Sequence, residues 1–199
     1  MRHTVDYYFA PQSPWTYLGH ARFAAIAQAA GATVRVLPVD LGQVFPVSGG
    51  LPLPKRAPQR QAYRLVELRR FATALNVPLN LQPRYFPVSG DDAARLIIAV
   101  DRYDGTEAAM RLAGAILAAC WAQERNIADD KTLAELLAEQ GLDPARLEQS
   151  HRQDVQERYE RDTQAAIDAS VFGAPSYVIN GEIFWGQDRL DFVERVLRG

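Results

Sequence analysis

Segments with β patterning occur only at the two ends of this chain, and this distribution constrains the fold more than any other feature. His3 to Phe9 and Thr33 to Val39 are rich in β-branched and aromatic residues, which is typical of strands. The next such segments, Ser176 to Ile179 and Glu182 to Trp185, lie close to the C-terminus. Because short strands are stable only beside neighbouring strands, we expect both ends of the chain to form one sheet.

A helix is predicted between the two N-terminal strands. Ser13-Pro14 is typical of a helix start, because serine is a good N-cap and proline is favoured at the first helical position. Gly31 is typical of a helix end. A crossover helix joins strands that run parallel, so residues 1–40 are predicted to form a β-α-β unit.

The two C-terminal strands are separated by Asn180-Gly181, which is a strong signal for a hairpin turn. Leu190 to Leu197 follows as an amphipathic helix. Between the two ends the patterning is helical from about residue 57 to residue 170. The sequence therefore predicts an α/β fold in which a sheet domain, residues 1–40 and 172–199, is interrupted by an all-helical insertion, residues 41–171.

Within the helical block, chain breaks are predicted at 77–78, 88–90, 104–105 and 141–144, where proline, glycine and small polar residues occur. Arg152 to Asp162 is densely charged with both signs, which indicates a solvent-exposed helix face with pairs four residues apart.

Composition excludes several function classes. The chain has 199 residues and a net charge of −2, whereas nucleic-acid-binding proteins usually carry a basic excess. No apolar run approaches the ~20 residues that a transmembrane helix needs. The N-terminus lacks the apolar core and cleavage site of a signal peptide. We therefore expect a cytoplasmic protein with neither a nucleic acid nor a membrane as partner.

The chain contains one cysteine, Cys120, so an internal disulfide and dithiol chemistry within one chain are excluded. At helical spacing Cys120 shares a face with apolar residues and is predicted to be a buried core thiol. The three histidines, His3, His20 and His151, lie far apart in sequence, and no metal site is predicted.

Ser13 is the first candidate functional residue. It follows a strand and begins a helix, where free N–H groups and the positive end of the helix dipole stabilise an anion such as a thiolate. A serine hydroxyl adds one more hydrogen bond to such an anion. The alternative is that Ser13 is only a helix cap.

Two C-terminal motifs are further candidates. Gly173-Ala174-Pro175 precedes a strand, and a cis bond before Pro175 would expose the backbone of Ala174 to an extended peptide; the alternative is a proline at a strand edge. In the loop Trp185-Gly186-Gln187-Asp188-Arg189, Asp188 could hold an ammonium group while Arg189 faces a carboxylate. The alternative is a loop in which Asp188 caps the last helix.

A local basic run is the fourth candidate. It is opposed only by Glu67 and consists of Lys55, Arg56, Arg60, Arg64, Arg69 and Arg70. The aromatic residues Phe45, Tyr85 and Phe86 lie in the same predicted insertion. A pocket with aromatic walls and basic ends would fit a flat aromatic carboxylate. The alternative is an exposed basic helix face.

The runs DYYFAPQSPWTYLG, DLGQVF and FGAPSYVINGEIFWGQDRL, with the helical block between them, resemble 2-hydroxychromene-2-carboxylate isomerases. These enzymes are grouped with the kappa-class glutathione transferases in the DsbA-like branch of thioredoxin folds. The resemblance covers essentially the whole chain. It implies a thioredoxin-like domain of the DsbA/kappa type, glutathione as cofactor and a homodimer.

The resemblance also implies roles for individual residues. Ser13 matches the catalytic serine that holds the glutathione sulfur. Ala174 and Pro175 match the segment whose backbone pairs with the cysteinyl part of glutathione. The loop residues that match the site for the γ-glutamyl end are Trp185, Gly186, Gln187, Asp188 and Arg189. The positions that match the pocket for the second substrate are Phe45, Lys55, Arg56 and Tyr85.

The chain departs from the family at three places. Naphthalene-pathway members carry a lysine at the position of Phe45, and many relatives read Thr-Gly-Asn where this chain reads Ser48-Gly49-Gly50. The residue before Ser13 is Gln12, where an acidic or aromatic residue is commoner. We expect Phe45 to make the substrate pocket more apolar and to shift preference away from the chromene carboxylate.

The resemblance implies a glutathione-dependent cis–trans isomerase of aromatic hydrocarbon catabolism, in which the glutathione thiolate adds reversibly to the substrate. One alternative is a kappa-like glutathione transferase that conjugates electrophiles. An alternative of another class is a non-catalytic peptide- or thiol-binding module. A disulfide oxidoreductase is disfavoured because Ser13-Pro14-Trp15-Thr16 contains no thiol.

Overall fold

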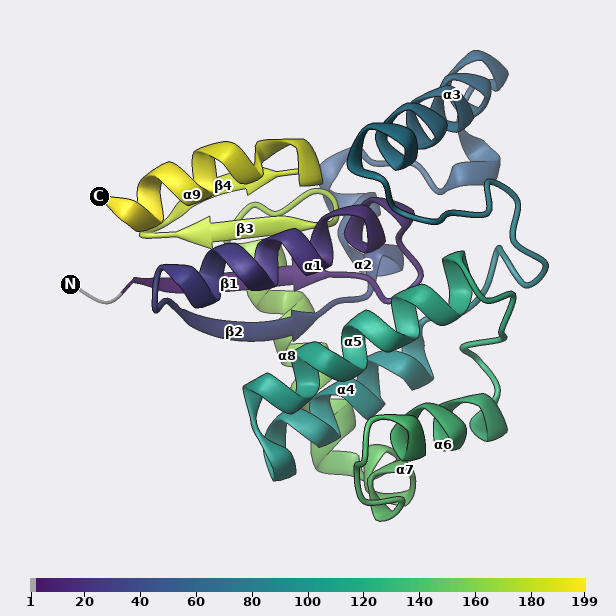
Figure 1. Ribbon diagram of the computed structural model, residues 1–199, viewed down its shortest axis with the longest axis vertical. Helices are drawn as coiled ribbons and strands as arrows, with labels where there is room; N and C mark the ends of the chain where they lie inside the picture. Colours follow the sequence, from purple (N-terminus) through teal and green to yellow (C-terminus); the bar gives the residue numbers. More distant parts are fainter. Residues whose placement is uncertain (1–2) are drawn as a thin grey trace.

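The computed structural model of the chain describes residues 3–199 and contains one four-stranded sheet in the order β2-β1-β3-β4 (Figure 1). The strands are β1 (Thr4–Phe9), β2 (Thr33–Pro38), β3 (Ser176–Ile179) and β4 (Glu182–Trp185). β1 runs parallel to β2 and antiparallel to β3, and β3 runs antiparallel to β4. Both ends of the chain therefore build one sheet, as predicted.

The local signals at the turns have the predicted effects. Helix α1 (Pro14–Ala29) joins β1 to β2, with Ser13 as its N-cap and Pro14 in its first turn. Gly31 follows the helix with a φ of 61°, a left-handed conformation that favours glycine. Asn180 and Gly181 have φ values of 52° and 81° and connect β3 to β4, as the predicted hairpin turn requires.

Helices cover both faces of the sheet. In Figure 1, α1 and α9 (Leu190–Arg198) lie on one side of the sheet and α8 (Gln153–Asp168) lies on the other. Alternate residues of β1 face the two sides, as the pleat of a strand requires. Tyr7 belongs to the core cluster that includes Phe23 of α1, whereas Tyr8 belongs to the cluster that includes Ala166 of α8.

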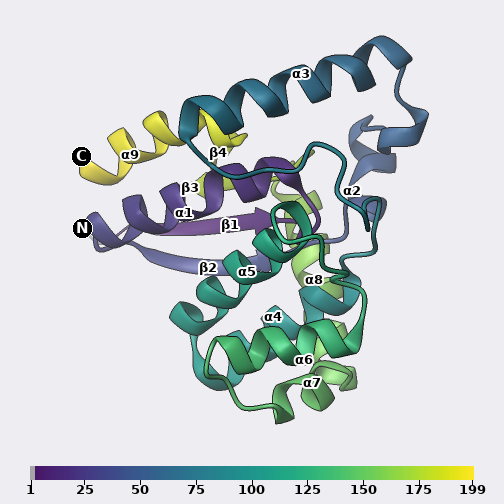
Figure 2. The same cartoon turned by 45° about the vertical axis from the view of Figure 1, so that its right-hand side comes forward.

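The insertion between β2 and β3 is helical, and no strand lies between Pro38 and Ser176 in the described chain. Its elements are α2 (Leu41–Ser48), the 3₁₀ turn η1 (Leu53–Lys55), α3 (Pro58–Leu75), α4 (Asp91–Asp104), α5 (Thr106–Trp121), α6 (Asp130–Glu139), α7 (Ala145–Ser150) and α8. Two of the four predicted breaks lie between α3 and α4, one lies between α4 and α5, and one lies between α6 and α7, whereas the break between α5 and α6 was not predicted. Figure 2 shows α4 to α7 packed below the sheet, while α3 extends along the opposite end of the molecule.

One hydrophobic core joins the sheet to the inserted helices. The largest cluster of buried side chains includes Tyr7 of β1, Leu96 of α4 and Leu112 of α5. All three side chains are fully buried. The helical insertion is therefore packed on the sheet and shares its core.

Helix α8 corrects the prediction of a purely solvent-exposed charged face for Arg152 to Asp162. Asp162 is buried, and the Arg158 guanidinium bonds both to it and to Asp101 of α4, at 3.3 and 2.7 Å. Tyr159 is also buried and donates a hydrogen bond to Asp91. The charges are accommodated because they pair across α4 and α8.

No helix within residues 3–199 is long and apolar enough to cross a membrane.

Candidate active site

Ser13 lies at the turn between β1 and α1 and is 8% exposed. Its backbone N–H donates to the Ala10 carbonyl at 3.0 Å, which closes the turn. Its Oγ accepts a hydrogen bond from the N–H of Thr16 at 3.2 Å. This bond uses a lone pair and leaves the hydroxyl proton free, so Ser13 can cap the helix and still donate to a ligand.

The Ala174–Pro175 peptide bond is cis, as predicted. Pairing of Tyr8 with Ser176 places this segment beside the end of β1, from which the chain continues to Ser13. The backbone N–H and C=O of Ala174 form no hydrogen bond within residues 3–199. The structure thus brings an unpaired backbone segment to the same edge of the sheet as the N-terminus of α1.

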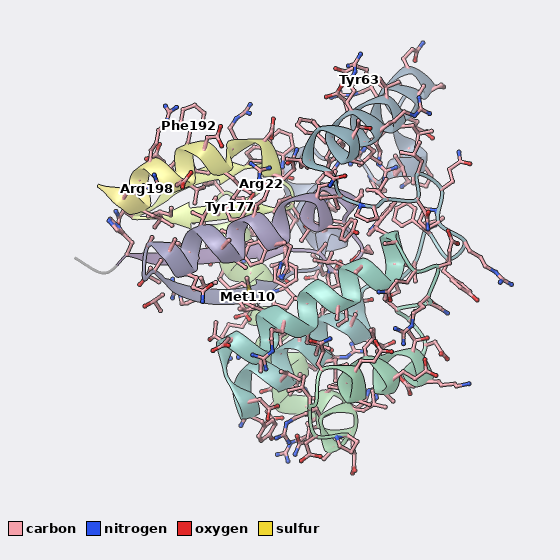
Figure 3. All side chains as sticks on the ribbon, in the orientation of Figure 1. Arg22, Tyr63, Met110, Tyr177, Phe192 and Arg198 are labelled. Carbon is pink, nitrogen blue, oxygen red and sulfur yellow. The ribbon has the colours of Figure 1, made fainter. Side chains whose placement is uncertain are left out.

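The loop from Trp185 to Arg189 is fixed against both β3 and α1. The N–H of Gly186 donates to the Pro175 carbonyl at 2.9 Å. Gln187 is 2% exposed and accepts a hydrogen bond from Arg22 of α1 at 3.2 Å. A Cβ atom on Gly19 would lie 2.7 Å from that of Gln187, so glycine permits the close approach of helix and loop. Figure 3 labels Arg22 where α1 crosses the sheet.

The loop exposes an aromatic ring and two opposite charges. Trp185 is 51% exposed and packs against Phe172, with 4.9 Å between the ring centroids. Asp188 and Arg189 are exposed and bond to each other at 2.8 Å. Asp188 does not cap α9, which corrects one of the two alternatives for this residue. It lies inside the 3₁₀ turn η2 (Gln187–Arg189), so Arg189 occupies the N-cap position of α9.

The residues expected around the second substrate are only partly brought together. The Arg56 guanidinium carbon lies 6.0 Å from the centroid of the Phe45 ring, and its Nε donates to the Leu51 carbonyl at 2.8 Å. Lys55 is exposed, and its ammonium group forms no hydrogen bond or ion pair within the described chain. Tyr85 is 38% exposed, with the guanidinium of Arg84 over its ring.

The structure adds residues to the site that sequence reasoning missed. The guanidinium carbon of Arg64 lies 5.4 Å from the centroid of the Phe86 ring and 5.8 Å from that of Trp121. Trp121 is fully buried, and its Nε1 donates to the backbone carbonyl of Gln12 at 3.2 Å. Arg64 is thereby linked through one ring to the loop that carries Ser13. The basic run pointed to Arg64, but no local signal connects α3 with Trp121 at the end of α5.

Cys120 is 1% exposed, and burial raises the pKa of its thiol to about 12. It is a buried core thiol, as predicted, and it is protonated at neutral pH. Since the segment from Ser13 to Thr16 also contains no thiol, the nucleophilic sulfur of any thiol chemistry at this site has to come from a ligand.

The fold and the site can now be set beside known proteins. A family model described as a DSBA-like thioredoxin domain matches residues 4–198. A 2-hydroxychromene-2-carboxylate isomerase of Pseudomonas putida is 32% identical over 97% of this chain and 93% of its own length. The chain belongs to this family. It has the DsbA-like thioredoxin fold and is an enzyme of the isomerase type.

Two further proteins are similar to the chain over nearly its whole length. A solved structure of a 2-hydroxychromene-2-carboxylate isomerase has a TM-score of 0.79 at 29% identity and covers 98% of this chain and 94% of that one. Glutathione S-transferase kappa 1 of Caenorhabditis elegans is 26% identical over 98% of this chain and 90% of its own length.

Proposed function

We propose that this chain is a glutathione-dependent cis–trans isomerase of the 2-hydroxychromene-2-carboxylate type, active as a cytoplasmic homodimer in aromatic hydrocarbon catabolism. The observation that carries the proposal is that Ser13 and the unpaired backbone of Ala174 lie at the same edge of the sheet. The Ser13 hydroxyl can donate a hydrogen bond to a sulfur atom, and the backbone of Ala174 can pair with an extended peptide.

The residues present fit glutathione, which is an extended tripeptide with a charged γ-glutamyl end. The free N–H and C=O of Ala174 match the backbone groups of its cysteinyl residue. The exposed pair Asp188 and Arg189 offers one acceptor for an ammonium group and one donor for a carboxylate. Between Ala174 and the pair Asp188–Arg189 in sequence, the half-exposed ring of Trp185 offers an apolar surface to the ligand.

Bound glutathione would supply a thiolate that adds reversibly to the conjugated double bond of the substrate, so that the bond can rotate before the thiolate leaves. A free thiol has a pKa of roughly 8.5 and is mostly protonated at neutral pH. Each unit by which the pKa is lowered requires about 1.4 kcal/mol of preferential stabilisation of the thiolate. Ser13 contributes by donating its hydroxyl proton, and α1 contributes the positive end of its dipole.

Replacement of Ser13 by alanine tests this role. We expect Ser13→Ala to lower turnover by about 10²-fold, as loss of a preorganised donor often does, and to change glutathione affinity much less. The pKa of the bound thiol should rise towards its value in free glutathione. The measurement is the ultraviolet thiolate absorbance of bound glutathione against pH. Identical titration curves for wild type and variant would show that Ser13 is only a helix cap.

A kappa-like transferase is the second candidate, and the similarity to the kappa 1 relative favours it. Both functions use the same glutathione site and differ in whether the adduct is released. Product analysis separates them, since an isomerase regenerates glutathione and a transferase consumes it. Glutathione binding without turnover of any carboxylate or electrophile would instead support a non-catalytic thiol-binding module.

A further inference from the structure

Arg64 is a half-buried cation that no acidic group neutralises. Within residues 3–199 its guanidinium takes part in no ion pair and no hydrogen bond, and lies over the rings of Phe86 and Trp121. Two other part-buried arginines of the insertion are paired, since Arg146 and Arg158 each contact two carboxylates. Burying a guanidinium without an anion beside it costs free energy, and a bound anionic ligand would offset this cost.

A second arginine adds to the positive charge at this position. Arg56 also lacks an acidic partner, and only its Nε is used, in the bond to the Leu51 carbonyl. Its terminal nitrogens remain available. Burial and the charge of Arg56 together lower the pKa of Arg64 to about 10. An anion bound at Arg64 would offset this positive charge.

The surroundings of Arg64 specify what kind of anion fits. The ring faces of Phe86 and Trp121 lie against the guanidinium, which leaves its N–H groups free to form a two-pronged contact. A carboxylate matches that planar fork. Trp121 bonds to the carbonyl of Gln12, the residue before Ser13, so the ring that supports Arg64 also contacts the loop that carries Ser13.

We propose that Arg64 binds the carboxylate of the aromatic second substrate. This inference rests on the proposed function, and it assigns the carboxylate contact to α3 and not to the exposed Lys55. The glycyl carboxylate of glutathione has the same chemistry and is the competing source of the anion. The partly exposed ring of Phe86 favours the aromatic acid, because a glycyl end offers no ring to pack against it.

Equilibrium binding tests the inference without depending on turnover. The probes are 2-naphthoate and its uncharged isostere 2-naphthamide, titrated by calorimetry into the full chain saturated with glutathione. We expect wild type to bind the carboxylate about 10- to 100-fold more tightly than the amide, the range for a charge-assisted pair. Arg64→Gln should remove this preference, and Arg64→Lys should restore only part of it, because lysine keeps the charge but lacks the fork.

Arg69→Gln is the matched control, since Arg69 lies on the same helix, is exposed and has no ionic partner in the described chain. It should leave the preference for the carboxylate unchanged. Equal binding of acid and amide by wild type would overturn the inference. If wild type has no isomerase activity but still binds the carboxylate more tightly than the amide, the proposed function is refuted and the inference about Arg64 is not.

A second arm identifies the source of the anion. Binding of glutathione and of its glycyl ethyl ester is compared in wild type and Arg64→Gln. If Arg64 binds the aromatic acid, the substitution should change both affinities by less than about twofold, well below the effect of losing a charge-assisted bond. A large loss for glutathione, with none for the ester, would assign Arg64 to the glycyl carboxylate and overturn the inference.

Discussion

His20 lies in the centre of the molecule with both ring nitrogens bonded. Its Nε2 is 2.9 Å from the Met110 carbonyl, which can only accept, so Nε2 carries the proton. Its Nδ1, 3.0 Å from the hydroxyl of Tyr7, is then the acceptor. This arrangement satisfies the neutral ring completely, and burial lowers the pKa of His20 below its ordinary value of 6.5.

The lowered pKa predicts a specific dependence of stability on pH. Below its ordinary pKa the unfolded chain binds a proton at His20 and the folded chain does not, so stability falls as pH falls. Between about pH 7.5 and about pH 5.5 this residue can reduce the free energy of unfolding by at most about 1.4 kcal/mol. Urea denaturation at both values should show a smaller decrease for His20→Gln than for wild type. Equal decreases would contradict the prediction.

The site residues that sequence alone could identify are those with local signals. Ser13 and Pro14 mark a strand-to-helix turn, and Pro175 precedes a strand that the hairpin signal locates. Arg64 and Trp121 belong to different helices, and only tertiary packing brings them together. Periodicity identified Trp121 correctly as a core residue but contained no information about which loop its Nε1 would reach.

At the scale of secondary structure, α3 is the element most loosely joined to the rest. Leu68 is its only fully buried side chain, and Tyr63 is 57% exposed and points away from the molecule in Figure 3. The helix is held by the edge-to-face contact of Trp15 with Phe71 and by the hydrogen bond from Tyr17 to the Pro78 carbonyl at 2.6 Å. Both tyrosine and tryptophan come from α1, so the basic helix is positioned by the helix that Ser13 begins.

The short helix α2 links two departures from the family pattern. The ring of Phe45 rests on Gly50, where a Cβ atom would overlap it, and the N–H of Gly50 donates to the Phe45 carbonyl at 3.1 Å. Gly50 does not have a positive φ, in contrast to Gly49 at 77°, so the ring alone excludes a side chain there. The Phe45 ring in this position therefore requires glycine at position 50.

A double-mutant cycle tests this linkage. Gly50→Asn alone should destabilise the chain by about 1–3 kcal/mol, because overpacking displaces the Phe45 ring. Phe45→Lys combined with Gly50→Asn should cost less than Gly50→Asn alone, which gives a coupling free energy of about 1 kcal/mol or more. Ser48→Asn, at an exposed neighbouring position, is the control and should be nearly neutral. Additive effects in urea denaturation would show that the two positions are independent.

The secondary structure shows where local patterns are sufficient and where they are not. The four strands and the helices α1 and α9 follow from β patterning, hairpin, cap and amphipathic signals, and helical periodicity indicated the block that contains α3 to α8. Helix α2 was not anticipated, because it is short and contains Pro46. Its start depends on the Asp40 carboxylate, which accepts from Gly42, and on a bond from the Asp40 N–H to Thr163 of α8 that sequence cannot show.

At the scale of the whole molecule, the helical block is an insertion in sequence but shares one hydrophobic core with the sheet in space. In sequence, residues 41–171 form an insertion, and the division into two domains stays a prediction. In space, side chains of β1, α4 and α5 belong to one cluster, and the buried bond network of Arg158 joins α8 to α4. A shared core of this kind makes independent folding of the insertion unfavourable, because its removal would expose the apolar faces of α4 and α5.

This arrangement predicts that the chain unfolds in one cooperative transition. Leu112 of α5 is fully buried in the shared core, and Leu112→Ala should lower the free energy of unfolding by about 2–5 kcal/mol. Amide hydrogen exchange followed by mass spectrometry should show that the free energy of opening decreases equally in β1 and in α4, although the substitution lies in the insertion. Ala62→Gly, in the exposed part of α3, is the control and should cost about 1 kcal/mol or less. Loss of protection in α4 and α5 with β1 unchanged would show instead that the sheet and the insertion are separate folding units.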